Sequence, residues 1–261
     1  CMNKNLVFTS ISMDHQEILG DSIEKITMEK AKAIISKEQY CISIKQKENV
    51  KNILNKQASN HSIKINFIKS ELINIETKYL LGKHQKENAT LAYELLLILN
   101  KHKIINIDLQ TLTKNIESTK WPGRFQKISN HPVVIFDVCH NEESLKMFYH
   151  NVKTYHDNGK TKFLICGFEY NKNVKHYINK MATVFEKIIC TETGIRKSMK
   201  MEKIGNYVNH PKKVILKKNV NEAIAFTKKI SSSSSEIFII GSHFLGPYVV
   251  KNFKNCFGIV S

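Results

Sequence analysis

The chain has 261 residues, of which 42% are hydrophobic and 24% are charged, and this composition is ordinary for a folded globular protein and excludes intrinsic disorder. A formal net charge of +17 means that binding to a polyanion such as nucleic acid has to be considered. No apolar stretch reaches the ~18 residues that span a membrane, and residues 1–20 lack the pattern of a cleavable signal peptide.

Apolar, strand-like runs alternate with amphipathic helical patterns along the chain, which predicts an α/β fold with mainly parallel strands. The expected strands are residues 6–13, 40–44, 63–68, 133–138, 162–168, 187–190, 214–217 and 236–242. The expected helices are residues 21–36, 48–59, 85–103, 108–117, 141–155, 173–186, 198–208 and 220–230. Asp21 followed by Glu24 has the spacing of a helix N-cap and its reciprocal partner, so we expect Asp21 to cap the first helix.

The pattern changes where a long helical section gives way to the sequence STKWPG, which contains a proline and a glycine. We therefore expect a domain boundary there, with domains at residues 1–119 and 120–261. The second domain has the order β-β-α-β-α-β-α-β-α-β of a complete doubly wound unit. The first has fewer strands than a closed α/β domain needs, and the chain enters an apolar run almost directly after Cys1. We expect that an N-terminal part of a longer protein is absent.

The positive charge is almost entirely lysine, since arginine occurs only at Arg124 and Arg196. Proteins that read nucleic-acid sequence usually rely on arginine and on stacked aromatic rings, and the basic residues here are spread over every segment. We therefore expect neither a nucleic-acid nor a membrane partner. Polyanion binding by the lysines stays an alternative.

The cysteines never form a C-x-x-C pair, and several lie inside apolar runs, where a reduced thiol behaves as a small hydrophobic side chain. A reducing compartment explains this pattern most simply, so the expected location is the cytoplasm. The six positions are Cys1, Cys41, Cys139, Cys166, Cys190 and Cys256.

Three places put polar side chains next to the carboxyl end of a strand or the start of a helix, where open α/β sheets build their sites. In SISMDHQEILGD, His15 follows the first strand and could bind a metal ion, although a histidine here can equally be structural; Lys30, on the next helix, can equally be a solvated lysine. In LLGKHQKENA, Asn88 could present its amide to a ligand or serve only in helix capping.

The third place is KWPGRFQKISNHPVVIFDVCHN. Here Asp137 and His140 follow an apolar strand, and Arg124 precedes it on what we interpret as the neighbouring strand. The guanidinium group of arginine suits phosphate because it donates two parallel charge-assisted hydrogen bonds. An aspartate at a strand end often accepts from ribose hydroxyl groups. Together these residues indicate a nucleotide.

Several motifs in order resemble the folylpolyglutamate synthase/dihydrofolate synthase family of the Mur ligase superfamily. They are SISMDHQEILGDSIEKITMEKAKAII, LLGKHQKENA, WPGRFQKI, VIFDVCHNEESL, ICGFEYNKN and GSHFLGPYVV, which extend from Leu6 to Val250. The resemblance implies an incomplete central ATP-binding domain followed by a complete C-terminal Mur ligase domain. It also implies an ATP-dependent amide ligase that acts as a monomer on dihydropteroate or a reduced folate and on L-glutamate, through an acyl phosphate and with Mg²⁺.

The resemblance further implies roles for individual residues. His15 resembles a magnesium-ligating histidine, and Lys30 resembles the lysine that the family carbamylates, so that it can hold the metal. Asn88, Arg124 and Asp137 resemble ATP-binding residues. His140 would lie near the phosphates.

The sequence departs from the family pattern at several positions. Val138 and Lys32 stand where glycine is usual, Glu142 where proline is usual, and Asn173 where aspartate is common. We expect Val138 to crowd its turn and to weaken nucleotide binding.

No glycine-rich phosphate loop, of either the G-x-x-x-x-G-K-[ST] or the T-N-G-K-G-S form, occurs in the chain. The chain alone is therefore expected to be inactive, either as a fragment of an ordinary enzyme or as a decayed or split gene product. A non-catalytic polyanion-binding remnant and a related cell-wall ligase are the alternative functions.

Overall fold

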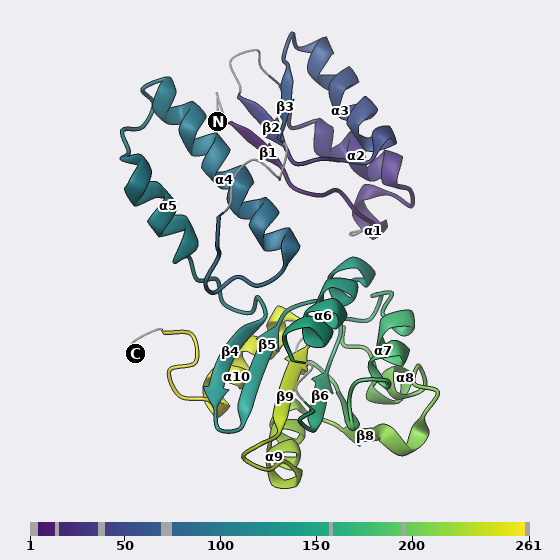
Figure 1. Cartoon of the computed structure of the whole chain (residues 1–261). Helices are drawn as coiled ribbons and strands as arrows, with labels where there is room; N and C mark the ends of the chain where they lie inside the picture. Colours follow the sequence, from purple (N-terminus) through teal and green to yellow (C-terminus); the bar gives the residue numbers. More distant parts are fainter. Residues whose placement is uncertain are drawn as a thin grey trace. The chain divides into compact units, whose positions relative to one another are not determined.

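The computed structural model describes residues 5–13, 16–35, 40–68, 75–156, 159–194 and 197–258. The chain divides into two compact units, Cys1–Thr119 and Lys120–Ser261 (Figure 1). This division falls where the sequence changes its pattern before Trp121. Among the described residues, no helix is both long enough and apolar enough to cross a membrane.

The described part of the first unit contains a parallel sheet with helices on both faces (Figure 1). The sheet has the order β1-β2-β3, formed by Leu6–Phe8, Cys41–Ser43 and Ile65–Phe67. Ile26 of α2 and Leu54 of α3 pack with Cys41 on one face, whereas Leu91 of α4 packs with Ile42 on the other. The helices are α1 (Gln16–Leu19), α2 (Ile23–Ala31), α3 (Glu48–Asn60), α4 (Lys83–Lys101) and α5 (Leu109–Glu117).

Two expectations for this unit were wrong in detail. Strand β1 ends at Phe8 and not at residue 13, because it pairs with only three residues of β2. Helix α2 is capped by Ser22 and not by Asp21: the Ser22 hydroxyl accepts a hydrogen bond of 3.2 Å from the Lys25 N–H. Asp21 instead pairs with the Lys25 ammonium group at 2.8 Å. The helix consequently starts at Ile23 and ends at Ala31, short of the expected residue 36.

The second unit confirms the doubly wound order predicted from the sequence. Its sheet has the order β4-β5-β9-β6-β7-β8, in which only β4 is antiparallel to its neighbour. The strands are β4 (Gln126–Asn130), β5 (Val133–Asp137), β6 (Lys162–Cys166), β7 (Lys187–Thr191), β8 (Val214–Lys217) and β9 (Glu236–Ile240). The helices are α6 (Glu142–Tyr155), α7 (Lys175–Met181), α8 (Met201–Gly205), α9 (Val220–Ile230) and α10 (Gly246–Asn252), the last of which the sequence analysis did not predict.

The central strands β5, β6 and β9 are buried on both faces, as expected for parallel strands between two layers of helices. Alternate side chains point to opposite faces. Phe136 and Ile239 therefore pack with Ile224 of α9 and Val249 of α10. On the other face the Phe238 ring meets the Phe148 ring of α6 edge-on, with the centroids 5.9 Å apart.

Gly241 follows β9 directly and brings its backbone against the segment that follows β6. Its φ is +123°, which L side chains rarely adopt, and a Cβ atom there would collide with the Gly167 carbonyl oxygen. The Gly167 N–H donates to the Ile240 carbonyl at 3.1 Å. Close packing of the carboxyl ends of β6 and β9 thus requires glycine at residue 241.

We expect Gly241→Ala to lower the free energy of unfolding by about 2–4 kcal/mol, because it combines backbone strain with a collision between backbone groups. Urea denaturation measures this change. Gly246→Ala is the matched control, because a Cβ atom there meets nothing within 4 Å. The control should change stability by less than about 1 kcal/mol, and equal effects of the two substitutions would contradict the role of Gly241.

Candidate functional site

The carboxyl ends of the parallel strands in the second unit form the candidate site. Although β9 comes last in the sequence, it lies between β5 and β6 in the sheet, so the connection from β5 through α6 to β6 passes over it (Figure 1). Such reversals of strand order leave a crevice outside the carboxyl ends of the strands, where open α/β sheets bind ligands. Asp137 is the last residue of β5 and lies at this edge.

Asp137 uses both carboxylate oxygens to hold two turns together. Oδ2 accepts from the Phe125 N–H at 2.7 Å, and Oδ1 accepts from the Cys139 N–H at 2.7 Å. Burial raises the pKa of Asp137, and the two N–H donors and the positive charge of Arg124 oppose this rise. Asp137, which we predict to bind a nucleotide, therefore also links the turn before β4 to the turn after β5.

Arg124 lies in the turn that precedes β4 and not on that strand, which corrects the expectation from the sequence. Its side chain is exposed, and its charge acts on Asp137. Left-handed backbone conformations flank it, with φ of +72° at Gly123 and +46° at Phe125. The turn thus presents the guanidinium group to solvent beside the half-buried Asp137 carboxylate.

Phe125 fixes this turn, and the sequence analysis did not identify it. A bulky residue with positive φ is strained, and the 2.7 Å hydrogen bond to Asp137 offsets part of that cost. Its buried ring lies 5.7 Å from the rings of Phe148 and His156, measured between centroids, and 6.3 Å from that of Phe238. The only signal in the sequence is its place directly after Arg124.

Val138 is accommodated by Gly123. The Val138 N–H donates to the Gly123 carbonyl at 2.9 Å, and a Cβ atom at Gly123 would lie 2.7 Å from Cγ1 of Val138. The valine side chain packs against the apolar cluster on the α9 and α10 face of the sheet. The absent side chain of Gly123 therefore makes room for Val138, whereas the expected weakening of nucleotide binding stays a prediction.

His140 occupies the turn between β5 and α6, which Asn141 and Ser144 rigidify. The Nδ1 atom of His140 lies 2.9 Å from the Val138 carbonyl oxygen, which can only accept, so Nδ1 carries a proton and neutral His140 has its acceptor lone pair on Nε2. Asn141 caps α6 by accepting from the Ser144 N–H at 2.9 Å. Asn141 is thus a structural residue, and His140 is the side chain of this turn with acid–base chemistry.

Two residues that depart from the family pattern, Asn173 and Glu142, contact each other. The Asn173 side-chain amide donates to the Glu142 carboxylate at 3.3 Å, which links the loop after β6 to the first turn of α6. An aspartate at residue 173 would place two carboxylates at this distance. The neutral amide at residue 173 therefore suits the acidic residue at 142.

Two of the predicted site residues of the first unit, Lys30 and Asn88, lie on separate helices. His15 lies outside the described residues. Lys30 is exposed in the last turn of α2, close to Lys32, which pairs with Glu29 at 2.5 Å. Asn88 lies in the second turn of α4 and donates to the side chain of Gln85 at 3.5 Å, so these two amides share one face of the helix.

Gln46 fixes the loop that leads from β1 toward residue 15, and the sequence analysis missed it. Its side-chain amide donates to the Thr9 carbonyl at 2.8 Å and to the Ser43 hydroxyl at 3.0 Å, and its oxygen accepts from the Ile11 N–H at 3.2 Å. One glutamine therefore joins the carboxyl ends of β1 and β2.

Within the described ranges, no group of three or more His, Cys, Asp or Glu side chains lies close enough together to hold a metal ion. Since His15 lies outside these ranges, the metal-binding roles of His15 and Lys30 stay predictions.

Cys139 and Cys166 are poor nucleophiles. Cys139 lies beside Asp137, and burial raises the pKa of its thiol well above the usual range. A hydrogen bond to Cys190, together with burial, does the same for Cys166. Since the thiolate is the reactive form, neither thiol is suited to covalent catalysis.

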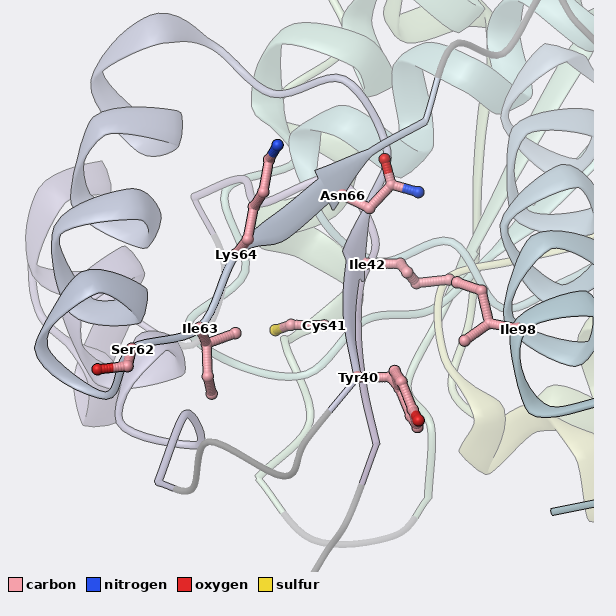
Figure 2. Close-up of a pocket in the computed structure, with 8 residues that line it drawn as sticks. All are labelled: Tyr40, Cys41, Ile42, Ser62, Ile63, Lys64, Asn66 and Ile98. Carbon is pink, nitrogen blue, oxygen red and sulfur yellow. The ribbon is translucent and has the colours of Figure 1, made fainter. Parts of the chain in front are cut away.

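A hollow of about 190 Å³ lies at the opposite end of the first unit's sheet, beside the amino ends of β2 and β3 (Figure 2). Figure 2 shows Tyr40 and Ile98 on one side of the sheet and Cys41 and Ile63 on the other. Burial raises the pKa of the Cys41 thiol to about 11. The hollow therefore offers no activated group and lies at the end of the strands where open α/β sheets do not build their sites.

The chain is similar in sequence to a known protein family and to characterised relatives. Residues 123–243 match the family described as Mur ligase, glutamate ligase domain. The dihydrofolate synthase/folylpolyglutamate synthase of Bacillus subtilis is 26% identical over 201 residues, which are 68% of this chain and 46% of that protein. This chain therefore spans about half the length of that relative.

Solved structures share the fold of the chain. The Mycobacterium tuberculosis folylpolyglutamate synthase complexed with ADP and AMPPCP has a TM-score of 0.80 at 19% identity, and the match covers 97% of this chain and 64% of that one. The Yersinia pestis bifunctional folylpolyglutamate synthase/dihydrofolate synthase complexed with AMPPNP and Mn ion has a TM-score of 0.75 at 13% identity, covering 96% and 62%.

We expect the stability advantage of the wild type over Asp137→Asn to shrink as the pH rises from about 4 toward 7. The raised pKa means that the folded chain holds the Asp137 proton more tightly than the unfolded chain does. The contribution of Asp137 is therefore complete below the ordinary carboxyl pKa of 3.8 and is lost as the pH rises through the folded-state pKa. Urea denaturation of both proteins over this range tests the sign, and an advantage that grows with pH would show that the pKa is lowered instead.

We expect Asn173→Asp to destabilise the second unit by up to about 1 kcal/mol at low salt, because it opposes two carboxylates. Adding Glu142→Gln should reverse the loss, and a double-mutant cycle measured by thermal unfolding gives the coupling. Glu143→Gln is the matched control, since Asn173 donates to Glu142. Equal rescue by both glutamine substitutions would refute the specific contact.

Proposed function

Because the chain belongs to the folylpolyglutamate synthase/dihydrofolate synthase family of the Mur ligases, we propose that it serves in the ATP-dependent addition of L-glutamate to dihydropteroate, to reduced folates or to both. The observation that carries the proposal is the exposed Arg124 held beside the half-buried Asp137 at the carboxyl edge of the sheet. This pair lies within the segment that matches the glutamate ligase domain.

In the proposed reaction, a carboxylate of the acceptor attacks the γ-phosphorus of ATP, which releases ADP and leaves an acyl phosphate. The amine of glutamate then attacks the acyl carbon, an amide bond forms, and inorganic phosphate leaves. Arg124 would bind the nucleotide phosphates through parallel charge-assisted hydrogen bonds, and Asp137 would accept from the ribose through lone pairs that its N–H donors do not use. His140 would lie near the phosphates of the nucleotide, and its Nε2 atom would carry the lone pair that can accept a hydrogen bond.

The first unit would contribute Asn88 to the nucleotide and Lys30, after carbamylation by carbon dioxide, together with His15, to a divalent metal. A bound Mg²⁺ would neutralise charge on the phosphates. Carbamylation converts the ammonium group to an anion, which explains how a lysine can serve as a metal ligand. The exposure of Lys30 leaves its amine accessible to this modification.

We further propose that these 261 residues do not complete the reaction alone, because they contain no glycine-rich phosphate loop. A monomer in the cytoplasm is the proposed state. The five buried free thiols of the described residues support a reducing compartment.

With an upstream segment that carries a phosphate loop joined to the chain, we expect glutamate-dependent release of ADP in the presence of dihydropteroate or tetrahydrofolate. Arg124→Ala should raise the KM for ATP about 10- to 100-fold, through loss of charge-assisted hydrogen bonds, and Arg124→Lys should recover only part of it. Lys127→Ala, which removes an exposed lysine of β4, is the control. Undiminished ATP use in both Arg124→Ala and Asp137→Ala would refute the site assignment.

A further inference from the structure

The positive charge of the chain is concentrated in the second unit. Residues 120–261 contain 23 Lys and Arg against 10 Asp and Glu, whereas residues 1–119 contain 17 against 13. No more than two basic residues of the second unit are consecutive in the sequence, so larger groups of positive charge can form only through the fold.

Helices α6 and α7 collect part of this charge on a shared face. Lys146, His150 and Lys153 are spaced by four and three residues and therefore line one side of α6. Helix α7 packs beside α6 (Figure 1), and the Tyr149 hydroxyl of α6 lies 3.2 Å from that of Thr183. Five exposed basic residues of the two helices, here called the basic stripe, are Lys146, His150, Lys153, His176 and Lys180; Lys175, at the start of α7, is also exposed.

Two ammonium groups of the basic stripe converge on one aromatic ring. The Nζ atoms of Lys153 and Lys180 lie 5.8 and 5.5 Å from the centroid of the Tyr149 ring. Among the described residues, no carboxylate forms an ion pair within 4 Å of either group. The acidic residues of α6 are confined to its first turn, and Asn173 holds one of them, Glu142. Within the described part of the chain, the positive charges of Lys153 and Lys180 are therefore not neutralised by an ion pair.

We propose that the basic stripe binds the acidic γ-glutamyl tail of the acceptor substrate. This inference rests on the proposed function, in which acceptors carry one or more glutamates, and each γ-linked glutamate exposes one free α-carboxylate. Helix α6 begins two residues after His140, so the stripe follows the same helix outward from the candidate site. A tail that leaves the site along α6 meets Lys146 first and then the pair at Tyr149.

The same surface is poorly suited to nucleic acid. Bases stack on exposed aromatic rings, and arginine is favoured over lysine for planar and bidentate contacts. The Tyr149 ring is only half-exposed, has two lysines against it and engages Thr183, and the stripe contains no arginine. Lysine ammonium groups act as compact point charges, which suits the separate carboxylates of an acidic peptide.

The test is fluorescence anisotropy of dye-labelled γ-linked tetraglutamate titrated with the 261-residue chain at low and physiological salt, which requires neither ATP nor turnover. The variant Lys146→Gln/Lys153→Gln/Lys180→Gln should bind about tenfold more weakly. The matched control, Lys229→Gln/Lys251→Gln/Lys254→Gln, removes the same charge from exposed lysines of α9, of α10 and of the segment after it, and should bind like the wild type. Thermal unfolding of each variant checks that the fold is intact.

Absence of tetraglutamate binding, or equal weakening in both triple variants, would overturn the proposal. Tighter binding of a single-stranded oligonucleotide of equal charge through the same lysines would overturn it in favour of a nucleic-acid surface. Glutamate ligation by the protein with its upstream segment is measured separately. Failure of the tail-binding proposal with ligation intact is therefore distinguishable from failure of the proposed function.

Discussion

The candidate site depends on one half-buried carboxylate, that of Asp137, and on the two backbone N–H groups that donate hydrogen bonds to it. Without these donors, burying Asp137 would be costly, and without the carboxylate, the left-handed backbone of Phe125 would lack its compensating bond. The aromatic ring of Phe125 anchors this arrangement in the core between α6 and the sheet. Arg124 therefore lies in a turn whose conformation is fixed by the packing of the Phe125 ring and by the hydrogen bond to the Asp137 carboxylate.

The architecture of the second unit was predictable because each strand and helix shows its own pattern within a short segment of the sequence. Apolar runs of strand length alternate with helical patterns, and this alternation indicates a parallel sheet between helices. The lengths of β1 and α2 were not predictable, since β1 ends where β2 stops pairing with it, and Ser22 displaces Asp21 as the cap. Helix α10 was missed because a short helix that begins with Gly-Pro has no clear pattern of its own.

The sequence indicates which residue types form the candidate site, whose role in binding stays a prediction, but it does not show the contacts that hold these residues in place. Arginine, aspartate and histidine near one strand end indicate nucleotide chemistry, but the sequence cannot show that Phe125 meets three rings that follow it by 23 to 113 residues. Two departures from the family pattern are also understood only in three dimensions. Val138 packs where Gly123 has no side chain, and Glu142 accepts from Asn173. Each unusual residue has a neighbour that accommodates it.

The position of β9 in the sheet affects when the second unit can fold during its synthesis. Strands β5 and β6 are separated in the sheet by β9, which follows β6 by about seventy residues. Until Glu236–Ile240 has been synthesised, the inner edges of both strands lack their partner, and the long-range pairing that completes the core cannot form. A second unit that lacked β9 would therefore lose the join between the two halves of its sheet, and two apolar strand edges stay without a partner while the residues between β6 and β9 are synthesised.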